Sequence, residues 1–170
     1  MSFVVEGKSR NDIRKVAMLC RKLQNAENEL YFPILDFVEK TLPSIIPNFS
    51  FRVGTMEEMG ECHGLTLPGK NEIVIREDVY DRAYAGSGRD RLTVAHELYH
   101  YIEHSSATVG FARTSKHELP KYMDPEWQAD AFGGELLVAS HLAKKLTVSE
   151  IAEKCGVSVA AARTQYRVMH

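Results

Sequence analysis

The chain has 170 residues, of which 44% are hydrophobic and 26% charged, and its formal net charge is -2. This length and composition predict one globular domain with a buried core and exclude a chain that is disordered by composition. The near-neutral balance excludes the overall basic field that draws proteins to nucleic acid or to anionic membranes.

The cysteines and the N-terminal segment predict a cytoplasmic protein. Cys20, Cys62 and Cys155 are odd in number and widely separated, which argues against a disulfide framework and for a reducing compartment. Residues 1–7 contain neither a cationic start nor a long apolar stretch, so they do not predict a signal peptide. No run approaches the roughly 18 apolar residues of a membrane span, so no membrane partner is expected.

Two helices and a small sheet are predicted in the first half of the chain. Apolar residues at helical spacing predict helices over 11–26 and 32–46, the first capped by Ser9 or Asn11. Cys20 lies on the apolar stripe of the first helix and is expected to be a core residue, not a reactive thiol. Strands are predicted at 49–53, at 64–69 with its Pro-Gly turn, and at 71–76. Together they predict a small antiparallel sheet of about three strands.

The region between the strands and the next helix is polar. Cys62 and His63 are metal ligands by type, but no second pair at finger-like spacing accompanies them. Their expected place is the edge of a cleft. Residues 78–89 predict a loop or a short turn of helix, in which Ser87 or Asp90 caps the helix that follows.

The stretch from Leu92 to His104 contains His-Glu-x-x-His in a helix-compatible run. Residues i and i+4 share one helix face, so His96 and His100 can direct their imidazoles at one metal ion while Glu97 lies next to that face. Two nitrogen ligands, a carboxylate base and an open coordination position are what a zinc peptidase requires. The motif also arises by chance, so its context decides.

A second helix, predicted from Pro125 to about Leu146, supplies that context. Glu126 and Asp130 share one of its faces. Glu126 is the candidate third zinc ligand, and Asp130 is the candidate acceptor for the N–H of a ligating histidine. Alone, the two acids are better explained as an acidic first turn stabilised by the helix dipole. Joined to the two histidines, they complete a His-His-Glu set.

Other metal arrangements fit less well. A metzincin site needs a glycine and a third histidine where this chain has Glu103 and Ser106. His104 would lie about 12 Å from the first ligand on the same helix axis, too far to share one ion. It is expected to pack or form a hydrogen bond near the helix end. The aperiodic stretch 105–124 is expected to border or cover the cleft.

The stretch Leu92–His104, followed by Glu126–Leu137, resembles the ImmA/IrrE family of metallopeptidases. Members show an Ala-His-Glu-x-Gly-His pattern and then Glu-x-x-Ala-Asn-x-Phe-Ala-Ala-Glu-Leu-Leu. The resemblance covers roughly residues 50–165 and implies a gluzincin-like core, a small sheet beside the active-site helices. Tyr99 replaces the usual glycine; helical spacing places it on the apolar side of the motif helix, opposite the metal-binding side, and its bulk is expected to narrow the cleft or change its edge. Asp130 replaces asparagine, and a double glycine at 133–134 replaces two alanines.

The resemblance also implies a function. His96, His100 and Glu126 would bind one Zn²⁺, Glu97 would act as the general base, and Asp130 would orient a ligand. The expected activity is cleavage of a regulatory protein, a helix-turn-helix repressor of a phage, mobile element or stress regulon. Candidates by residue type for contacts to the oxyanion or the substrate are Tyr122, His117, Arg113 and His63.

Residues 141–170 have the pattern of a helix-turn-helix. Thr147 or Ser149 caps one helix, Gly156 ends it, and Ser158 caps the next. Five basic side chains against two acidic ones give a mild basic excess, so contact with DNA is one interpretation and packing on the catalytic core is the favoured one. The alternative function is a non-proteolytic zinc-containing regulator or toxin-like protein that acts through protein or DNA contacts.

The predicted fold class is α+β, a mainly helical metallopeptidase core with a small sheet and a C-terminal helix pair. One domain is expected over 1–170, with N-terminal helices at 1–48, the sheet and active-site helices at 49–140, and the helix pair at 141–170.

Overall fold

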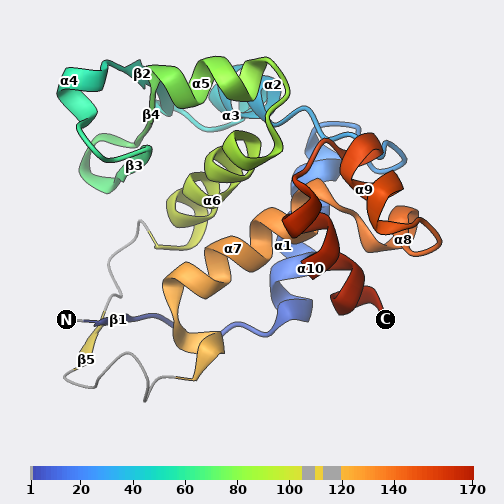
Figure 1. The fold of residues 1–170 in the computed structure, drawn as a ribbon. Helices are drawn as coiled ribbons and strands as arrows, with labels where there is room; N and C mark the ends of the chain where they lie inside the picture. Colours follow the sequence, from blue (N-terminus) through green and yellow to red (C-terminus); the bar gives the residue numbers. More distant parts are fainter. Residues whose placement is uncertain (1, 105–109, 113–119) are drawn as a thin grey trace.

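The computed structural model describes residues 2–104, 110–112 and 120–170 and has an α+β fold (Figure 1). In chain order its elements are β1 Ser2–Val4, α1 Arg10–Leu23, α2 Ile34–Asp36, the π-helical turn η1 Phe37–Thr41, α3 Leu42–Ile45, β2 Ser50–Gly54, α4 Met56–Met59, β3 Gly64–Leu67, the 3-10 turn η2 Pro68–Lys70, β4 Glu72–Arg76, α5 Glu77–Tyr84, α6 Gly88–His104, β5 Gly110–Ala112, the 3-10 turn η3 Lys121–Met123, α7 Pro125–Leu137, α8 Ser140–Ala143, α9 Val148–Cys155 and α10 Val159–Met169. Within the described residues, no helix is both long and apolar enough to cross a membrane.

The three-stranded sheet is mixed, in the order β2-β4-β3. The chain returns from β3 to β4 through the short turn η2, so these strands pair antiparallel. The helix α4 and strand β3 lie between β2 and β4 in the sequence, and the chain comes back in the same direction, so β2 and β4 pair parallel. Three strands were predicted correctly, but the prediction of an antiparallel sheet was wrong for β2.

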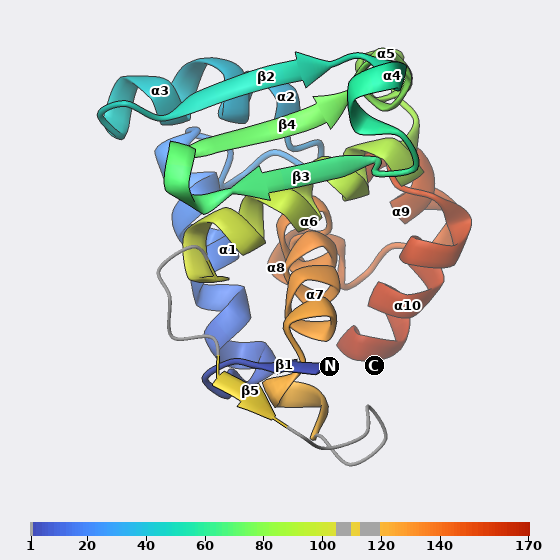
Figure 2. The same ribbon diagram turned by 90° about the vertical axis from the view of Figure 1, so that its left-hand side faces the viewer.

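Helix α6 lies at the centre of the fold. It runs beneath the sheet and alongside α7 (Figure 2), and it contacts β3, β4, α5 and α7. Val94, Ala95 and Leu98 on its inner side are fully buried. This buried side packs on the core, and the side that bears His96 and His100 faces the cavity described below.

Tyr99 belongs to the buried side of α6. Its side chain is fully buried, and its ring centroid lies 4.9 Å from that of Phe132 on α7 and 5.2 Å from that of His104. The prediction that Tyr99 lies on the apolar side of the helix is therefore confirmed, and the expectation that it narrows the cleft or changes its edge was wrong. Its bulk fills the space between α6 and α7, and the cavity beside the histidines is lined by other residues.

The double glycine in α7 lies where two other helices cross it. A Cβ atom at position 133 would stand 2.6 Å from Leu92 Cδ1 of α6, and one at position 134 would stand 2.7 Å from Gln165 Oε1 of α10. Glycine weakens a helix by about 1 kcal/mol per residue relative to alanine. A methyl group at either position would require the end of the Leu92 or Gln165 side chain to move.

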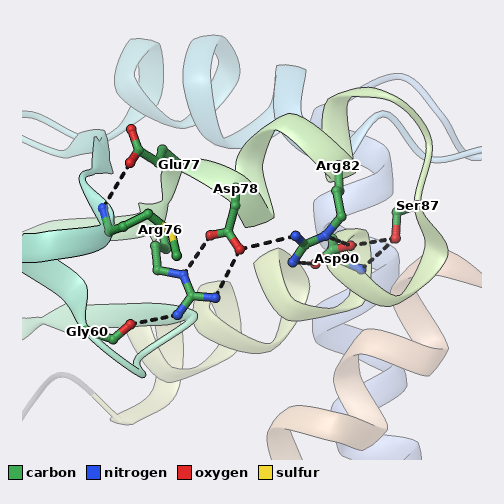
Figure 3. A network of polar contacts seen from close by, with 8 residues as sticks. Gly60, Arg76, Glu77, Asp78, Arg82, Ser87 and Asp90 are labelled. Atoms are coloured by element: carbon green, nitrogen blue, oxygen red, sulfur yellow. Dashed lines mark hydrogen bonds and ion pairs between the residues drawn. The ribbon is translucent and has the colours of Figure 1, made fainter.

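The start of α6 is fixed by a chain of ion pairs (Figure 3). Arg76 at the end of β4 donates to Asp78 on α5 at 2.6 Å, and Arg82 joins Asp78 to Asp90 at 3.1 and 3.0 Å. Ser87 Oγ also donates to Asp90, at 2.6 Å. The stretch 78–89 was predicted as a loop or a short turn of helix, and its first part is the helix α5, which these contacts tie to β4 and to α6.

Two other helix boundaries differ from the sequence predictions. Residues 34–45 form one continuous helical run, α2–η1–α3, capped at Pro33 and passing through Pro43. Helix α7 ends at Leu137, well before the predicted Leu146. The buried Arg21 of α1 donates to the carbonyl oxygens of Leu136 at 2.8 Å and Leu137 at 3.4 Å. These bonds satisfy terminal carbonyls that an ending helix leaves without partners.

The C-terminal helix pair packs on the core, as favoured from the sequence. Thr147 and Glu150 form a capping box, Gly156 adopts a left-handed conformation with φ of 65°, and Ser158 caps α10. Arg91 of α6 is fully buried and donates to the carbonyl oxygen of Cys155 at 2.9 Å, besides that of Gly156. The turn between α9 and α10 is therefore tied to the motif helix.

The short strands β1 and β5 were not predicted, and they pair antiparallel away from the main sheet. Strand β5 and the turn η3 fall inside the stretch 105–124 that was predicted as a loop. Residues 105–109 and 113–119 lie outside the described residues, and with them the greater part of the segment expected to cover the cleft.

Candidate metal centre

His96, His100 and Glu126 bring three donor atoms to one point. His96 Nε2 lies 3.0 Å from His100 Nε2, and the carboxylate oxygens of Glu126 lie 3.0 Å from His96 Nε2 and 3.1 Å from His100 Nε2. The histidines come from successive turns of α6 and the glutamate from the first turn of α7. Among the described residues, this is the group of three that could hold a metal ion.

The spacing of these donors fits zinc. Tetrahedral ligands at about 2.0–2.1 Å from the ion lie roughly 3.3 Å from one another. The observed separations of 3.0 to 3.1 Å are close to this value. Two imidazole nitrogens and one carboxylate oxygen are also a donor set that catalytic zinc uses.

Asp130 lies behind His96. Its carboxylate oxygen is 2.7 Å from His96 Nδ1, so Nδ1 carries the hydrogen and donates it. In the neutral ring, Nε2 is then free to offer its lone pair to an ion. The structure thus places Asp130 in the contact that the sequence predicted for it.

The two acids raise the proton affinity of the site. Burial alone would lower the pKa of His96, but hydrogen bonds to Asp130 and Glu126 outweigh it and raise the pKa to about 10. The contacts with the His100 and His96 rings in turn hold the pKa of Glu126 well below its usual range. The centre therefore holds a proton at neutral pH that a metal ion must displace.

Glu97 faces the same cavity as the donors. Its carboxylate accepts a hydrogen bond from the Thr66 hydroxyl of β3, with 2.9 Å between Thr66 Oγ1 and Glu97 Oε2. Strand β3 can approach this closely because residue 64 is glycine, where a Cβ would stand 2.7 Å from Glu97 Cγ. Thr66 was missed in the sequence, because only the packing of β3 on α6 brings it to the motif.

The cavity beside the centre has a volume of about 610 Å³. His96, Glu97, His100 and Glu126 line it on the helix side, β3 lines it on the sheet side, and Val5 of the N-terminal segment also borders it. A cavity of this size admits a segment of peptide, and it brings the candidate base and the candidate ligands to one space.

Of the four candidates for oxyanion or substrate contact, the structure describes His63 and Tyr122, and neither belongs to the donor group. His63 lines a neighbouring hollow that it shares with Glu97 and Asp130. Tyr122 is half exposed, and among the described residues it does not line either space. Arg113 and His117 lie outside the described residues.

The cysteines take no part in the centre. Cys20 is buried, and burial raises the pKa of its thiol to about 12, which confirms a core role. Cys155 is buried as well, and Cys62 is exposed. Cys62 and His63 are not members of the donor group found among the described residues.

His100 has its own partner on the side away from the centre. His100 Nδ1 lies 2.7 Å from His104 Nδ1, and His104 Nε2 lies 2.9 Å from Gln128 Oε1. The expected hydrogen bond of His104 near the helix end is thus present. The role of Gln128 was missed in the sequence, because a residue two positions from Glu126 in a helix does not share its face.

The chain was compared with models of known protein families and with curated proteins, and neither comparison gave a match. Its function therefore has to be inferred from the site itself.

Proposed function

We propose that this protein is a zinc-dependent endopeptidase. The observation that carries the proposal is the convergence of the His96, His100 and Glu126 donors at about 3 Å, in a cavity that Glu97 also lines. Three protein ligands leave a fourth position open to water or substrate, which distinguishes catalytic zinc sites from closed structural ones.

The residues divide the chemistry among them. Bound zinc would acidify a coordinated water and polarise the scissile carbonyl. The Glu97 carboxylate takes a proton from the attacking water and delivers it to the leaving amine. The Thr66 hydroxyl holds that carboxylate in place, and Asp130 holds the His96 ring with its Nδ1–H pointing away from the metal.

The substrate is proposed to be an extended segment of a protein. Strand β3 is an edge of the three-stranded sheet, and Gly64, Leu65 and Thr66 line the cavity. An extended peptide can add to such an edge by main-chain hydrogen bonds. The resemblance of the two helices to the ImmA/IrrE pattern favours a helix-turn-helix repressor as the protein that supplies this segment.

A closed structural site is less well supported. Such sites fill the fourth position with cysteine or histidine. Cys62 is exposed and does not line the cavity among the described residues. His104 lies near the centre, but its ring nitrogens contact His100 and Gln128. The non-proteolytic alternative therefore has no fourth ligand in the described part of the chain.

The proposal is tested with purified protein and a purified helix-turn-helix repressor as the candidate substrate. Wild type should bind one zinc ion and cleave the repressor, and a chelator should stop cleavage. Glu97→Gln should retain zinc but lose about 10²–10⁴-fold in cleavage rate, the range for a positioned general base. Glu103→Gln, on the same helix and outside the lining of the cavity, is the matched control and should cleave as wild type does.

Two results would contradict the proposal. Equal cleavage by wild type and Glu97→Gln would remove Glu97 as the base. Salt-dependent DNA binding by a protein that never cleaves the repressor would favour the non-proteolytic regulator instead.

A further inference from the structure

The second histidine of the motif is held differently from the first. His96 donates directly to an exposed carboxylate, that of Asp130. His100 meets another imidazole, His104, which in turn meets the side-chain amide of Gln128. This second arrangement contains no carboxylate, and Gln128 at its end is 1% exposed.

The orientation of the Gln128 amide is fixed by two backbone carbonyls. Its Nε2 donates to Glu6 O at 2.9 Å and to Tyr122 O at 2.7 Å. Both amide hydrogens are thereby used, and Oε1 must be the atom that faces His104. A carbonyl oxygen accepts and does not donate, so His104 Nε2 carries a hydrogen.

The position of one hydrogen then determines the next. A neutral imidazole with a hydrogen on Nε2 has a free lone pair on Nδ1. Burial disfavours a charged ring at this place, so His104 Nδ1 accepts. The short contact of 2.7 Å between the two Nδ1 atoms therefore requires that His100 Nδ1 donates. His100 Nε2 is left without a hydrogen and faces His96 and Glu126.

We propose that Gln128, acting through His104, selects the tautomer of His100 whose Nε2 can bind the metal. Both are positioning residues, since neither belongs to the group of donors that could hold the ion. The inference rests on the proposed metal centre, because the selected lone pair has a use only if an ion binds there. Metal-ligating histidines generally need such an outer partner, and its loss typically costs 10–100-fold in metal affinity.

A partner at this point is needed because Glu126 favours the opposite tautomer. Its carboxylate lies 3.1 Å from His100 Nε2 and would accept a hydrogen from it. With the hydrogen on Nε2, His100 Nδ1 would carry no hydrogen, and His104 would have to donate one from its own Nδ1. His104 Nε2 would then face Gln128 Oε1 with lone pair against lone pair, unless the ring became charged in a buried place.

The same contacts make the N-terminal segment part of the support of the site. Gln128 joins α7 to Glu6 and to η3, and Val5 next to Glu6 lines the cavity. A carboxylate at position 128 could also accept from His104, but it could not donate to the two carbonyls, and its burial would cost free energy. Glutamine meets all three partners without a charge.

The tautomer can be read in zinc-free protein by ¹⁵N NMR of the histidine rings, with the signals of His100 assigned by their loss in His100→Asn. In wild type at neutral pH, His100 should carry its hydrogen on Nδ1. Gln128→Met keeps the length of the side chain and removes the acceptor, so the hydrogen should move to Nε2. The zinc Kd, measured by chelator competition, should rise about 10–100-fold.

Matched variants separate this role from general damage to the core. Gln165→Met changes another glutamine that is 1% exposed, on α10, and should leave both the tautomer and the zinc Kd unchanged. Gln128→Glu retains an acceptor and should keep the hydrogen on Nδ1 even if the protein is less stable. His104→Phe, which keeps an aromatic ring without an acceptor, should behave as Gln128→Met does and provides the test if that variant fails to fold.

The inference and the function fail in different ways. If His100 carries its hydrogen on Nε2 in zinc-free wild type, or if neither Gln128→Met nor His104→Phe moves it, the inference is overturned whatever the protein cleaves. If wild type does not bind zinc, the metal centre is overturned, and the inference falls with it even when the hydrogen lies on Nδ1. A shift in both tautomer and Kd supports the inference without any measurement of cleavage.

Discussion

Helix α6 takes part in two polar clusters, which differ in whether their charges and hydrogen-bonding groups are paired with one another. At its start, Arg76, Asp78, Arg82 and Asp90 alternate in charge, and each carboxylate meets guanidinium donors at 2.6 to 3.1 Å. One turn and a half further on, His96 Nε2, His100 Nε2 and the Glu126 carboxylate face one another at about 3 Å. In the first cluster, each carboxylate has a positively charged partner. In the second, two histidine nitrogens and a carboxylate oxygen, all of which can offer an electron pair, face one another.

This difference separates a structural network from a site. Arg76 beside Asp78 holds the pKa of that carboxyl well below its usual range, so the first cluster keeps its charges without any added ion. The second cluster can be satisfied in two ways, by a proton on His96 or by a cation among all three donors. A cluster of donor atoms that needs a proton or a cation to be satisfied is a candidate binding centre.

Removing the third donor should have the largest effect on zinc binding. In Glu126→Gln, the amide is a poorer ligand and the anionic charge next to the two histidines is lost. We expect the zinc Kd to rise by more than the roughly 100-fold that loss of an outer partner costs, measured by chelator competition and by metal content after dialysis.

The other cluster supplies the control for this measurement. Asp78→Asn also removes one negative charge from an ion-paired carboxylate but lies on α5, and it should leave the zinc Kd unchanged. If Glu126→Gln bound zinc as tightly as wild type, the carboxylate would not be a ligand and the two clusters would not differ as described.

The dependence of zinc binding on pH should be the next largest effect. The pKa of His96 in the metal-free protein is raised to about 10, so zinc must displace a proton throughout the neutral range. The zinc affinity should therefore rise about tenfold per pH unit between pH 6 and 8. In Asp130→Ala this slope should be smaller near pH 8, because loss of the acceptor lowers the pKa of His96.

As the pH rises, the zinc affinity should increase, whereas the stability of the metal-free protein should decrease. A group whose pKa is raised on folding contributes fully below its unfolded value, about 6.5 for histidine, and loses that contribution as the pH rises through the folded value. The Tm of metal-free wild type should therefore contain a term that falls from pH 7 to 10. Glu153→Ala, an exposed acid on α9, should keep both profiles, and flat profiles in wild type would show that His96 holds no such proton.

The candidate centre was predictable because its spacing is local. His96 and His100 are four residues apart in one helix, as are Glu126 and Asp130 in another, and helical geometry alone places each pair on one face. Composition and periodicity likewise predicted the α+β class, three strands and the capped C-terminal helices at Thr147 and Ser158. Each of these inferences needed only residues within about one turn or one strand of each other.

The remaining features depend on contacts between distant parts of the chain. Arg21, more than 100 residues earlier in the chain, donates to the carbonyl oxygens of Leu136 and Leu137 at the end of α7. Thr66 reaches Glu97 only because β3 packs on α6. The parallel pairing of β2 with β4 follows from the path of the chain through α4 and β3, which no alternation of apolar and polar residues can specify.

The smallest expected effect comes from the cluster at the start of α6, and it concerns stability instead of zinc. Asp90 is 4% exposed and accepts from Arg82 and from the Ser87 hydroxyl. Asp90→Ala should lower the free energy of unfolding by about 1–2 kcal/mol, the cost of leaving Arg82 and the Ser87 hydroxyl without their acceptor, measured by urea unfolding of metal-free protein. The zinc Kd should stay within about twofold of wild type, because the helix that carries His96 is held on both sides by β3 and α7. A loss of zinc affinity comparable to that in Glu126→Gln would mean that the ion pairs at the start of α6 set the position of the histidines, and the two clusters would then act as one.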